Sequence, residues 1–240
     1  HTARAAANFP LSTRRVRPEL IRALALVKLA AAETNAALGK LDAEKARVIM
    51  AAALEVASGQ WADQFVTHAF QGGAGTSTNM NMNEVLANRA NEMLGAAKGD
   101  YSSIHPIDHV NLSQSTNDVY PTALKIALIQ ALAKLSEACA TLQGALQKKE
   151  AAFAGVVKVG RTELQDALPI ALGQAFGAYA EALARDRWRL YKVEERLRQV
   201  NLGGTAVGTG LNADRRYMAV MMEKLRTLTQ IKLNLEMAAT

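Results

Sequence analysis

Apolar residues recur at helical spacing through the first hundred residues, and turn residues separate the repeats. The pattern predicts three helices, from Pro18 to Gly39, from Asp42 to Gly59 and from Asn83 to Gly95. Proline is favoured in a first helical turn, where its missing N–H has no helical partner. Aspartate is a typical N-cap, and glycine commonly ends a helix. The N-terminal part of the chain is therefore expected to be helical.

From Pro121 onward the apolar pattern becomes much longer. One seam alternates in steps of four and three, through Leu128, Leu132, Leu135, Cys139, Leu142 and Leu146. A second long helix is predicted from about Leu172 to Val200, after a short extended segment, VVKVG. Such seams are typical of helices that pack nearly parallel to their neighbours. Helices of about 30 residues, roughly 45 Å long, indicate a bundle that other subunits continue.

Composition agrees with a helical protein. The 240 residues are 50% apolar and only 5% aromatic, and alanine and leucine, which favour helices, are abundant. The formal net charge is +6, but the basic residues are scattered among acidic ones, so no nucleic-acid partner is expected. Cys139 is the single cysteine, which excludes an internal disulfide. Without an apolar run of roughly 18 residues or a signal peptide, we expect a cytoplasmic protein with no membrane partner.

Four polar stretches interrupt the helical periodicity. They are QGGAGTSTNMN (71–81), HPIDHVNLSQSTNDVYPT (105–122), GRTELQDALPIALGQ (160–174) and NLGGTAVGTGLNA (201–213). Each combines hydroxyl or amide side chains with a position at the mouth of a predicted helix, where free backbone N–H groups favour anions. Neutral donors of this kind suit the recognition of carboxylates.

Several familiar site patterns are excluded. GTGLNA matches a dinucleotide-binding pattern but follows a helix rather than a strand, and GGAGTST lacks the lysine of a phosphate-binding P-loop. His105 and His109 are four residues apart, but Pro106 disfavours a regular helix between them. No metal site is expected, because cysteine or glutamate does not stand at ligand spacing. Both histidines are expected to be loop residues satisfied by hydrogen bonds.

The four stretches, with HTARAAANFPLS at the start, closely resemble the aspartase/fumarase superfamily in sequence and order. GGAGTSTNMN and QSTND are more similar to the aspartase branch than to fumarases, which tend to read TGSGTQSNMN and QSSND. The resemblance implies a mainly α fold, with an N-terminal helical domain (1–113) and the first part of a central long-helix bundle (114–240). It also implies a homotetramer whose subunits share active sites.

The resemblance further implies a carbon–nitrogen lyase that converts L-aspartate reversibly to fumarate and ammonia, by anti-elimination through an aci-carboxylate and without a cofactor or metal. The positions that match substrate-binding residues are Thr76, Ser77, Ser115, Thr116, Asn117 and Thr162. Thr76 and Asn117 are expected near the amino group. Thr162 and Glu163 are the residues expected to take part in catalysis.

Two departures from the family pattern leave alternatives open. Glu163 stands where many members have histidine or glutamine, so it is expected to contact the amine, to have a raised pKa, or to point away. The serine loop that carries the family's general base, typically GSSIMPAKVNP, does not occur in these 240 residues. We therefore expect a piece of a longer protein. A class II fumarase and a catalytically silent helical oligomerisation piece remain alternatives.

Overall fold

The computed structural model describes residues 1–240 except residues 9, 11, 71–73 and 236–240. It is mainly α-helical, as predicted, with four short strands among the described residues. Two compact units are present: His1–Leu128 with Arg198–Thr240 (unit 1), and Ile129–Leu197 (unit 2). The boundary between the units falls inside one helix, α5 (Thr116–Ala152). The domain boundary expected after residue 113 concerns the complete protein and stays a prediction.

Unit 1 is built on helices whose ends follow the sequence signals. Its elements include α1 (Thr2–Asn8), α2 (Pro18–Ala37), α3 (Ala43–Ala57), α4 (Thr76–Met93) and α7 (Tyr217–Thr229), with the single-turn helices η1 (Ala62–Gln64) and η2 (Pro106–Val110). Pro18 begins α2, as predicted. The Asp42 carboxylate accepts from the backbone N–H of Glu44 at 2.9 Å and of Lys45 at 3.1 Å. Asp42 is therefore the N-cap that the sequence predicted.

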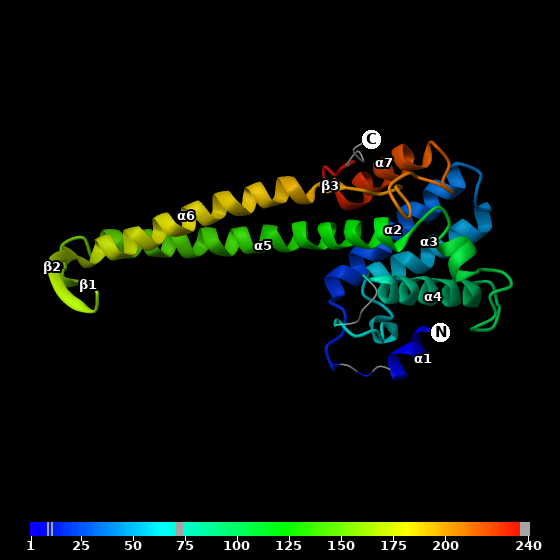
Figure 1. Ribbon diagram of the computed structural model, residues 1–240, viewed down its shortest axis with the longest axis horizontal. Coiled ribbons are helices and arrows are strands. Elements are labelled where there is room, and N and C mark those ends of the chain that lie inside the picture. The colour runs from blue at the N-terminus through cyan, green and yellow to red at the C-terminus, as the bar shows by residue number, and fades with distance from the viewer. Residues whose placement is uncertain (9, 11, 71–73, 236–240) are drawn as a thin grey trace. The chain divides into compact units, whose positions relative to one another are not determined.

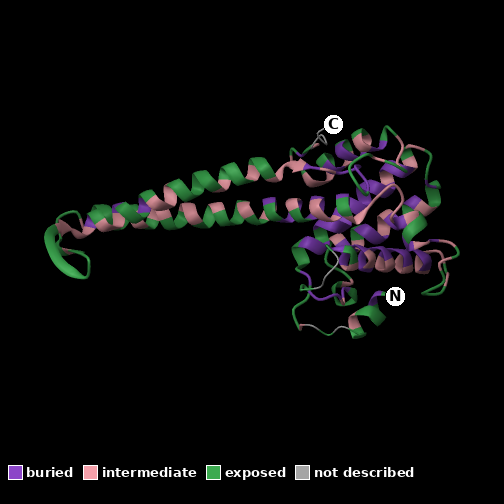
Figure 2. Cartoon of the chain, in the orientation of Figure 1, coloured by how far each residue is buried: buried purple, intermediate pink, exposed green. Residues whose placement is uncertain are grey.

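The core of unit 1 lies where α2 packs against α3 and α7, and where α3 packs against α4 (Figure 1). Buried residues concentrate in these helices (Figure 2). Alanine, leucine and β-branched side chains make up much of the core, which includes Leu24, Val27, Ala31, Ile49, Ala53, Leu86 and Leu225. Small alanines allow the helix axes to approach closely, and the larger side chains fill the space between them.

Helix α4 begins earlier than the sequence pattern predicted, at Thr76 rather than near Asn83. The added turns contain asparagines, which have low helix propensity. Their side chains are buried and bonded: Asn81 donates to the Gln64 carbonyl and accepts from the Val66 N–H, both at 3.0 Å. These tertiary bonds outweigh the local preference. The first three residues of the polar run, 71–73, lie outside the described residues.

Helix α5 also begins earlier, at Thr116, so Pro121 lies inside the helix rather than at its start. Proline has no N–H, so the carbonyl four residues before it, that of Asn117, lacks its helical donor. The side-chain Nδ2 of Asn201 donates to that carbonyl at 3.0 Å. Asn201, which begins the glycine-rich stretch NLGGTAVGTG (201–210), therefore supplies the missing hydrogen bond.

Unit 2 contains the rest of α5, an antiparallel hairpin and α6 (Leu172–Leu197). The hairpin strands are β1 (Val157–Thr162) and β2 (Gln165–Ala171), so the VVKVG segment is extended, as predicted. Gly173 and Gly177 allow α6 to approach α5 closely. A Cβ on Gly173 would lie 2.5 Å from the carbonyl oxygen of Glu150, and one on Gly177 would lie 2.4 Å from the Glu150 carboxylate.

The leucine seam of α5 is only partly covered within this chain. Leu135 and Leu142 are 49% and 52% exposed. The aromatic residues of α6 that are also largely exposed are Tyr179, Trp188 and Tyr191. In unit 1, the short strands β3 (Gln199–Val200) and β4 (Asn234–Leu235) pair in parallel. In the part of the chain that the structure describes, no helix has the length and apolar character needed to span a bilayer.

Candidate functional site

The N-terminal turns of α4 and α5 meet in unit 1. Gly75, with a left-handed φ of 87°, precedes α4 and places Thr76 at its first position. One turn later, Nδ2 of Asn79 donates to the Thr116 hydroxyl at 2.9 Å, and Thr116 is the first residue of α5. Two helix N-termini therefore lie beside each other, and each carries partial positive charge.

Five of the seven residues expected at the site belong to these two helix starts. They are Thr76, Ser77, Ser115, Thr116 and Asn117. Thr76 and Asn117 are exposed and the other three are half-buried. The Ser115 hydroxyl accepts from the Asn117 N–H at 3.2 Å, which holds the segment in a tight helix-entry turn. The arrangement offers the hydroxyls of Thr76, Ser77, Ser115 and Thr116 beside two helix N-termini, which suits an anion that carries carboxylates.

Buried polar side chains of α2 and α4 contact the residues that precede α5. Lys28 of α2 is fully buried, and its Nζ donates to Oδ1 of Asn111 and to Oε1 of Gln114, both at 2.9 Å. Oδ1 of Asn111 also accepts from Nδ2 of Asn79 at 3.3 Å and from Nδ2 of Asn83 at 3.1 Å. These contacts tie α2 and α4 to the residues that enter α5. Asn79 and Asn83 therefore serve the scaffold.

Burial shifts the proton equilibria of this layer. Loss of solvation lowers the pKa of Lys28 to about 7, and the nearby Asp118 opposes the shift. Loss of solvation raises the pKa of Asp118 to about 6, while hydrogen bonds from the backbone of Ser115 and Thr205 act in the opposite direction. Burial, then the Asp118 charge, also raises the pKa of Tyr217. Ionised groups are thus held at a cost, in a poorly solvated layer under the neutral donors.

The two remaining predicted residues, Thr162 and Glu163, belong to unit 2. Thr162 ends β1 and pairs with Gln165, and Glu163 and Leu164 form the two-residue turn of the hairpin. Glu163 and Leu164 have positive φ values of 50° and 65°, as a turn of this length requires. Thr162 and Glu163 are both exposed. Their roles at the site, together with those of the five residues in unit 1, stay predictions.

Sequence reasoning missed two supporting residues, Lys28 and Asp118. Lys28 did carry a signal, because it stands alone inside the apolar run ALALVKLAAA of a helix with many buried residues. A lysine in such a run is rarely buried without partners. Asp118 is the last residue of the quoted QSTND, but nothing in its spacing showed that it turns inward and is 1% exposed.

His105 caps η2 and His109 lies within it, so the loop expected at His109 is a single helical turn, but both rings are hydrogen-bonded, as predicted. Nδ1 of His105 accepts from the N–H groups of Ile107 and Asp108 at 3.3 and 3.1 Å. Nδ1 of His109 accepts from the His105 N–H at 2.8 Å, and its Nε2 lies 3.1 Å from Nζ of Lys45. Both rings therefore stabilise the turn that leads toward Ser115. Across the described ranges, no group of three acidic, histidine or cysteine side chains is placed to hold a metal ion.

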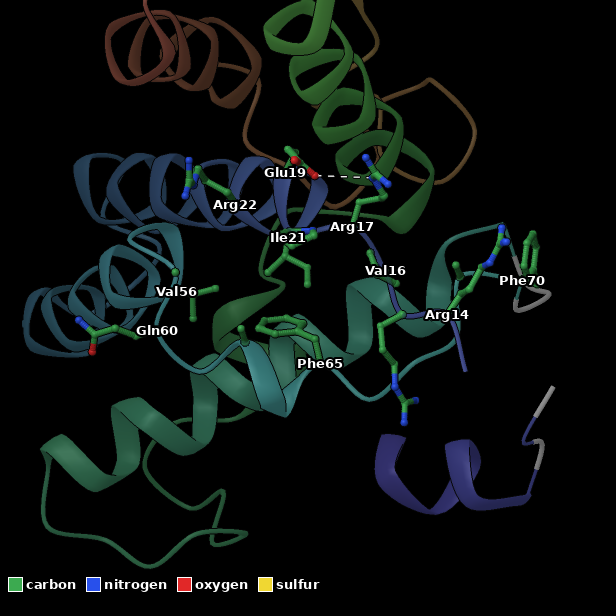
Figure 3. A pocket seen from close by; sticks show the side chains of 15 residues that line it. Arg14, Val16, Arg17, Glu19, Ile21, Arg22, Val56, Gln60, Phe65 and Phe70 are labelled. Carbon is green, nitrogen blue, oxygen red and sulfur yellow. Dashed lines mark ion pairs between the residues drawn. The ribbon is translucent and has the colours of Figure 1, made fainter. Parts of the chain in front are cut away.

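A separate pocket of about 860 Å³ lies in unit 1, between the segment that enters α2 and the segment that follows α3 (Figure 3). Its apolar wall includes Val16, Ile21, Val56 and Phe65. The arginines at its edge turn to different partners: Arg17 lies 3.8 Å from the Glu19 carboxylate, and the Arg14 guanidinium lies 5.9 Å from the centre of the Phe70 ring. None of the seven predicted site residues lines this pocket.

Known proteins are similar to this chain in both sequence and fold. The chain is 52% identical over 224 residues to an aspartate ammonia-lyase of Bacillus sp, a match that covers 93% of this chain and 48% of that protein. It is 50% identical over 212 residues to a class II fumarate hydratase of Nitrosomonas europaea, covering 88% of this chain and 46% of that protein. The chain thus spans about half the length of the curated relatives it matches.

Solved structures give the same picture. A cobalt-bound fumarate lyase:delta crystallin from Brucella melitensis superposes with a TM-score of 0.93 at 49% identity, over 98% of this chain and 52% of that one. A class II fumarase from Schistosoma mansoni superposes with a TM-score of 0.89 at 35% identity, over 95% and 48%. A family model described as "Lyase" matches residues 1–240, the whole chain, and the protein therefore belongs to this lyase family.

Proposed function

We propose that the complete protein is an aspartate ammonia-lyase, which converts L-aspartate reversibly to fumarate and ammonia. The observation that carries the proposal is the meeting of two helix N-termini at Thr76 and Ser115–Asn117, joined by the bond from Asn79 to Thr116. Three relatives named aspartate ammonia-lyase, 46% to 52% identical to this chain, support the choice of substrate. The reaction would take place in the cytoplasm.

The proposed reaction explains why the site donors are neutral. A base removes a proton from the carbon beside the side-chain carboxylate, and the product is an aci-carboxylate with a second negative charge. Preorganised hydrogen-bond donors stabilise such a charge as it develops, and each is worth about 3 kcal/mol in the barrier. The hydroxyls of Ser115 and Thr116 are donors of this kind. Ammonia then leaves from the adjacent carbon.

Thr162 and Glu163 complete the proposed site from a neighbouring subunit of a homotetramer. The partly exposed leucine seam of α5 and the exposed aromatic residues of α6 support a bundle shared between subunits. By resemblance to the family, the general base is a serine on a glycine–serine loop, and no such segment occurs in these 240 residues. We therefore propose that these 240 residues alone do not turn over substrate.

The test is the appearance of fumarate absorbance when the complete protein is given L-aspartate or malate. Fumarate from aspartate and not from malate is the expected result. A class II fumarase is the second candidate, because the Nitrosomonas europaea relative with that name is 50% identical. Fumarate from malate alone would establish this alternative. Fumarate from neither substrate would favour the third reading, a silent helical oligomerisation piece.

A further inference from the structure

The carboxylate of Asp118 joins two segments that lie far apart in the sequence. Its Oδ1 accepts from the backbone N–H of Ser115 at 3.2 Å, and its Oδ2 accepts from the backbone N–H of Thr205 at 2.8 Å. Asp118 is 1% exposed and Thr205 is 8% exposed, so both bonds are shielded from water. Charge-assisted bonds to backbone N–H groups are about twice as strong as neutral ones. The carboxylate therefore holds Ser115, just before α5, to Thr205 in the glycine-rich stretch 201–210.

Asn117 makes two further bonds to the same stretch. Its Nδ2 donates to the Ala206 carbonyl at 2.7 Å, and its own carbonyl accepts from Nδ2 of Asn201 at 3.0 Å. The second bond exists because Pro121 cannot supply the helical donor to that carbonyl. Asn117 is thus held at both its side chain and its backbone.

The glycine-rich stretch 201–210 is shaped to make these contacts. Thr205 has a left-handed φ of 56°, and Gly208 has a φ of 91°. The N–H groups of Gly208 and Gly210 both donate to the Gly204 carbonyl, at 3.0 and 2.9 Å, so the loop closes on itself. A loop closed by its own backbone bonds holds Thr205 and Ala206 in fixed positions and can act as a rigid support.

The contact with Ala206 decides which end of the Asn117 amide faces the site. Because Nδ2 is directed to a carbonyl, Oδ1 is the end available to a ligand, and a carbonyl oxygen only accepts hydrogen bonds. An ammonium group only donates. We propose that Asp118, Asn201, Thr205 and Ala206 form a positioning clamp that holds Oδ1 of Asn117 toward the amino group of the substrate. The proposal rests on the proposed lyase function and adds positioning residues to it.

Two variants of the complete protein test the clamp, Asn201→Ala and Asp118→Asn. The kinetic measurement is the reverse reaction, with separate KM values for ammonium and for fumarate. A displaced Asn117 amide should raise the KM for ammonium at least fivefold and change the KM for fumarate less than twofold in Asn201→Ala. Asp118→Asn replaces one acceptor oxygen with a donor, so it should raise the ammonium KM at least as much. Hydrogen exchange of peptides spanning 111–119 and 201–210 is measured in parallel.

Asn91→Ala is the matched control, because Asn91 is also a buried side chain that bonds backbone on both of its polar atoms, to Ile104 at 2.9 and 3.0 Å. It should lower stability without changing either KM. Equal rises in both KM values, or none, would overturn the clamp. If the unmodified protein forms no aspartate, the proposed function fails and with it the role of the clamp toward an amino group, and hydrogen exchange then decides only whether these residues hold Asn117 in place. Faster exchange at both peptides in the two variants, and not in the control, supports it; unchanged exchange refutes it.

Discussion

Gly75 lies so close to Tyr120 that a Cβ on the glycine would be 2.4 Å from the aromatic ring. The contact sets the distance between the start of α4 and the first turns of α5. Gly75 also has a φ of 87°, which residues with a Cβ rarely adopt. Gly75→Ala should therefore lower the free energy of unfolding by roughly 2–4 kcal/mol, through overpacking and backbone strain together.

Gly39→Ala separates the two effects. Gly39 has a φ of 69° and no atom within 4 Å of its would-be Cβ, so only the strain applies and a loss of about 1 kcal/mol is expected. Denaturant unfolding of both variants measures the difference. An equal loss in the two variants would mean that the ring of Tyr120 moves away at no cost.

The buried Lys28 should make stability depend on pH. Its pKa is about 7 in the folded protein and 10.5 in the reference state, so the unfolded chain binds the additional proton between these values. The free energy of unfolding therefore rises as the pH increases from about 7 to 10.5. Lys28→Met should flatten this rise. Asp118 does not interfere, because its raised pKa lowers stability in a different window, as the pH increases from 3.8 to about 6.

Denaturant midpoints at pH 7.5, 8.5 and 9.5 measure the slope. Lys224→Met is the control, because Lys224 pairs with Glu33 at 2.7 Å and its pKa is raised rather than lowered. The control should keep the rise between pH 7.5 and 9.5. If Lys28→Met keeps the same slope as well, Lys28 is not the group that titrates.

In the hairpin turn of unit 2, glycine at position 164 should give a more stable structure than the native leucine. Leu164 is fully exposed and has a φ of 65°, a backbone conformation that costs a leucine about 1 kcal/mol and costs a glycine little. Leu164→Gly should therefore stabilise unit 2 by about 0.5–1 kcal/mol, as seen by thermal unfolding. Leu168→Gly, in strand β2, should destabilise it by a similar amount. Destabilisation by Leu164→Gly would show that Leu164 is packed in the assembled protein.

The leucine seam should control assembly. Glutamate at Leu135 and Leu142 would place charge on the half-exposed face of α5, and burying those charges between subunits is unfavourable. The double variant should shift the complete protein from the proposed tetramer to smaller species, as measured by light scattering after size-exclusion chromatography. Glutamate at Lys148, an exposed residue outside the seam, should leave the mass unchanged. A double variant that remains tetrameric would remove the seam from the interface.

Substitution of Glu163 tests whether the hairpin contributes to catalysis, as predicted. Glu163→Gln keeps the shape of the side chain but removes its charge. If Glu163 contacts the substrate amine, the variant should raise the KM for aspartate about tenfold and change the pH dependence of the rate. Unchanged kinetics would leave the alternative that Glu163 points away from the substrate.

The sequence predicted the helices whose ends carry local signals. The N-cap Asp42 and the first-turn Pro18 fix α3 and α2 through bonds within a few residues, so they could be read directly. The starts of α4 and α5 were placed too late, because their first turns are stabilised by distant partners. Asn81 bonds to the backbone of Gln64 and Val66, and the carbonyl of Asn117 bonds to Asn201.

Around the starts of α4 and α5, the resemblance pointed to the polar side chains, whose roles stay predictions, and the buried layer beneath them could not be predicted. Lys28 and Asp118 are charged residues that the usual preference places on the surface. Their burial depends on partners from other elements, such as Asn111 for Lys28 and Thr205 for Asp118. Periodicity reports which face of one helix is apolar, but it does not report which side chains from different helices meet.

The helical position of Pro121 has a consequence for the order of folding. In the first turn of α5, the carbonyl of Asn117 lacks its helical hydrogen bond. Asn201, which follows α6 in the sequence, supplies the replacement. During synthesis, Ser115–Asn117 leave the ribosome long before their support does. Ser115–Asn117 should therefore become rigid only after residues 201–206 have packed against them. This contact forms late in folding, because it joins residues far apart in the sequence.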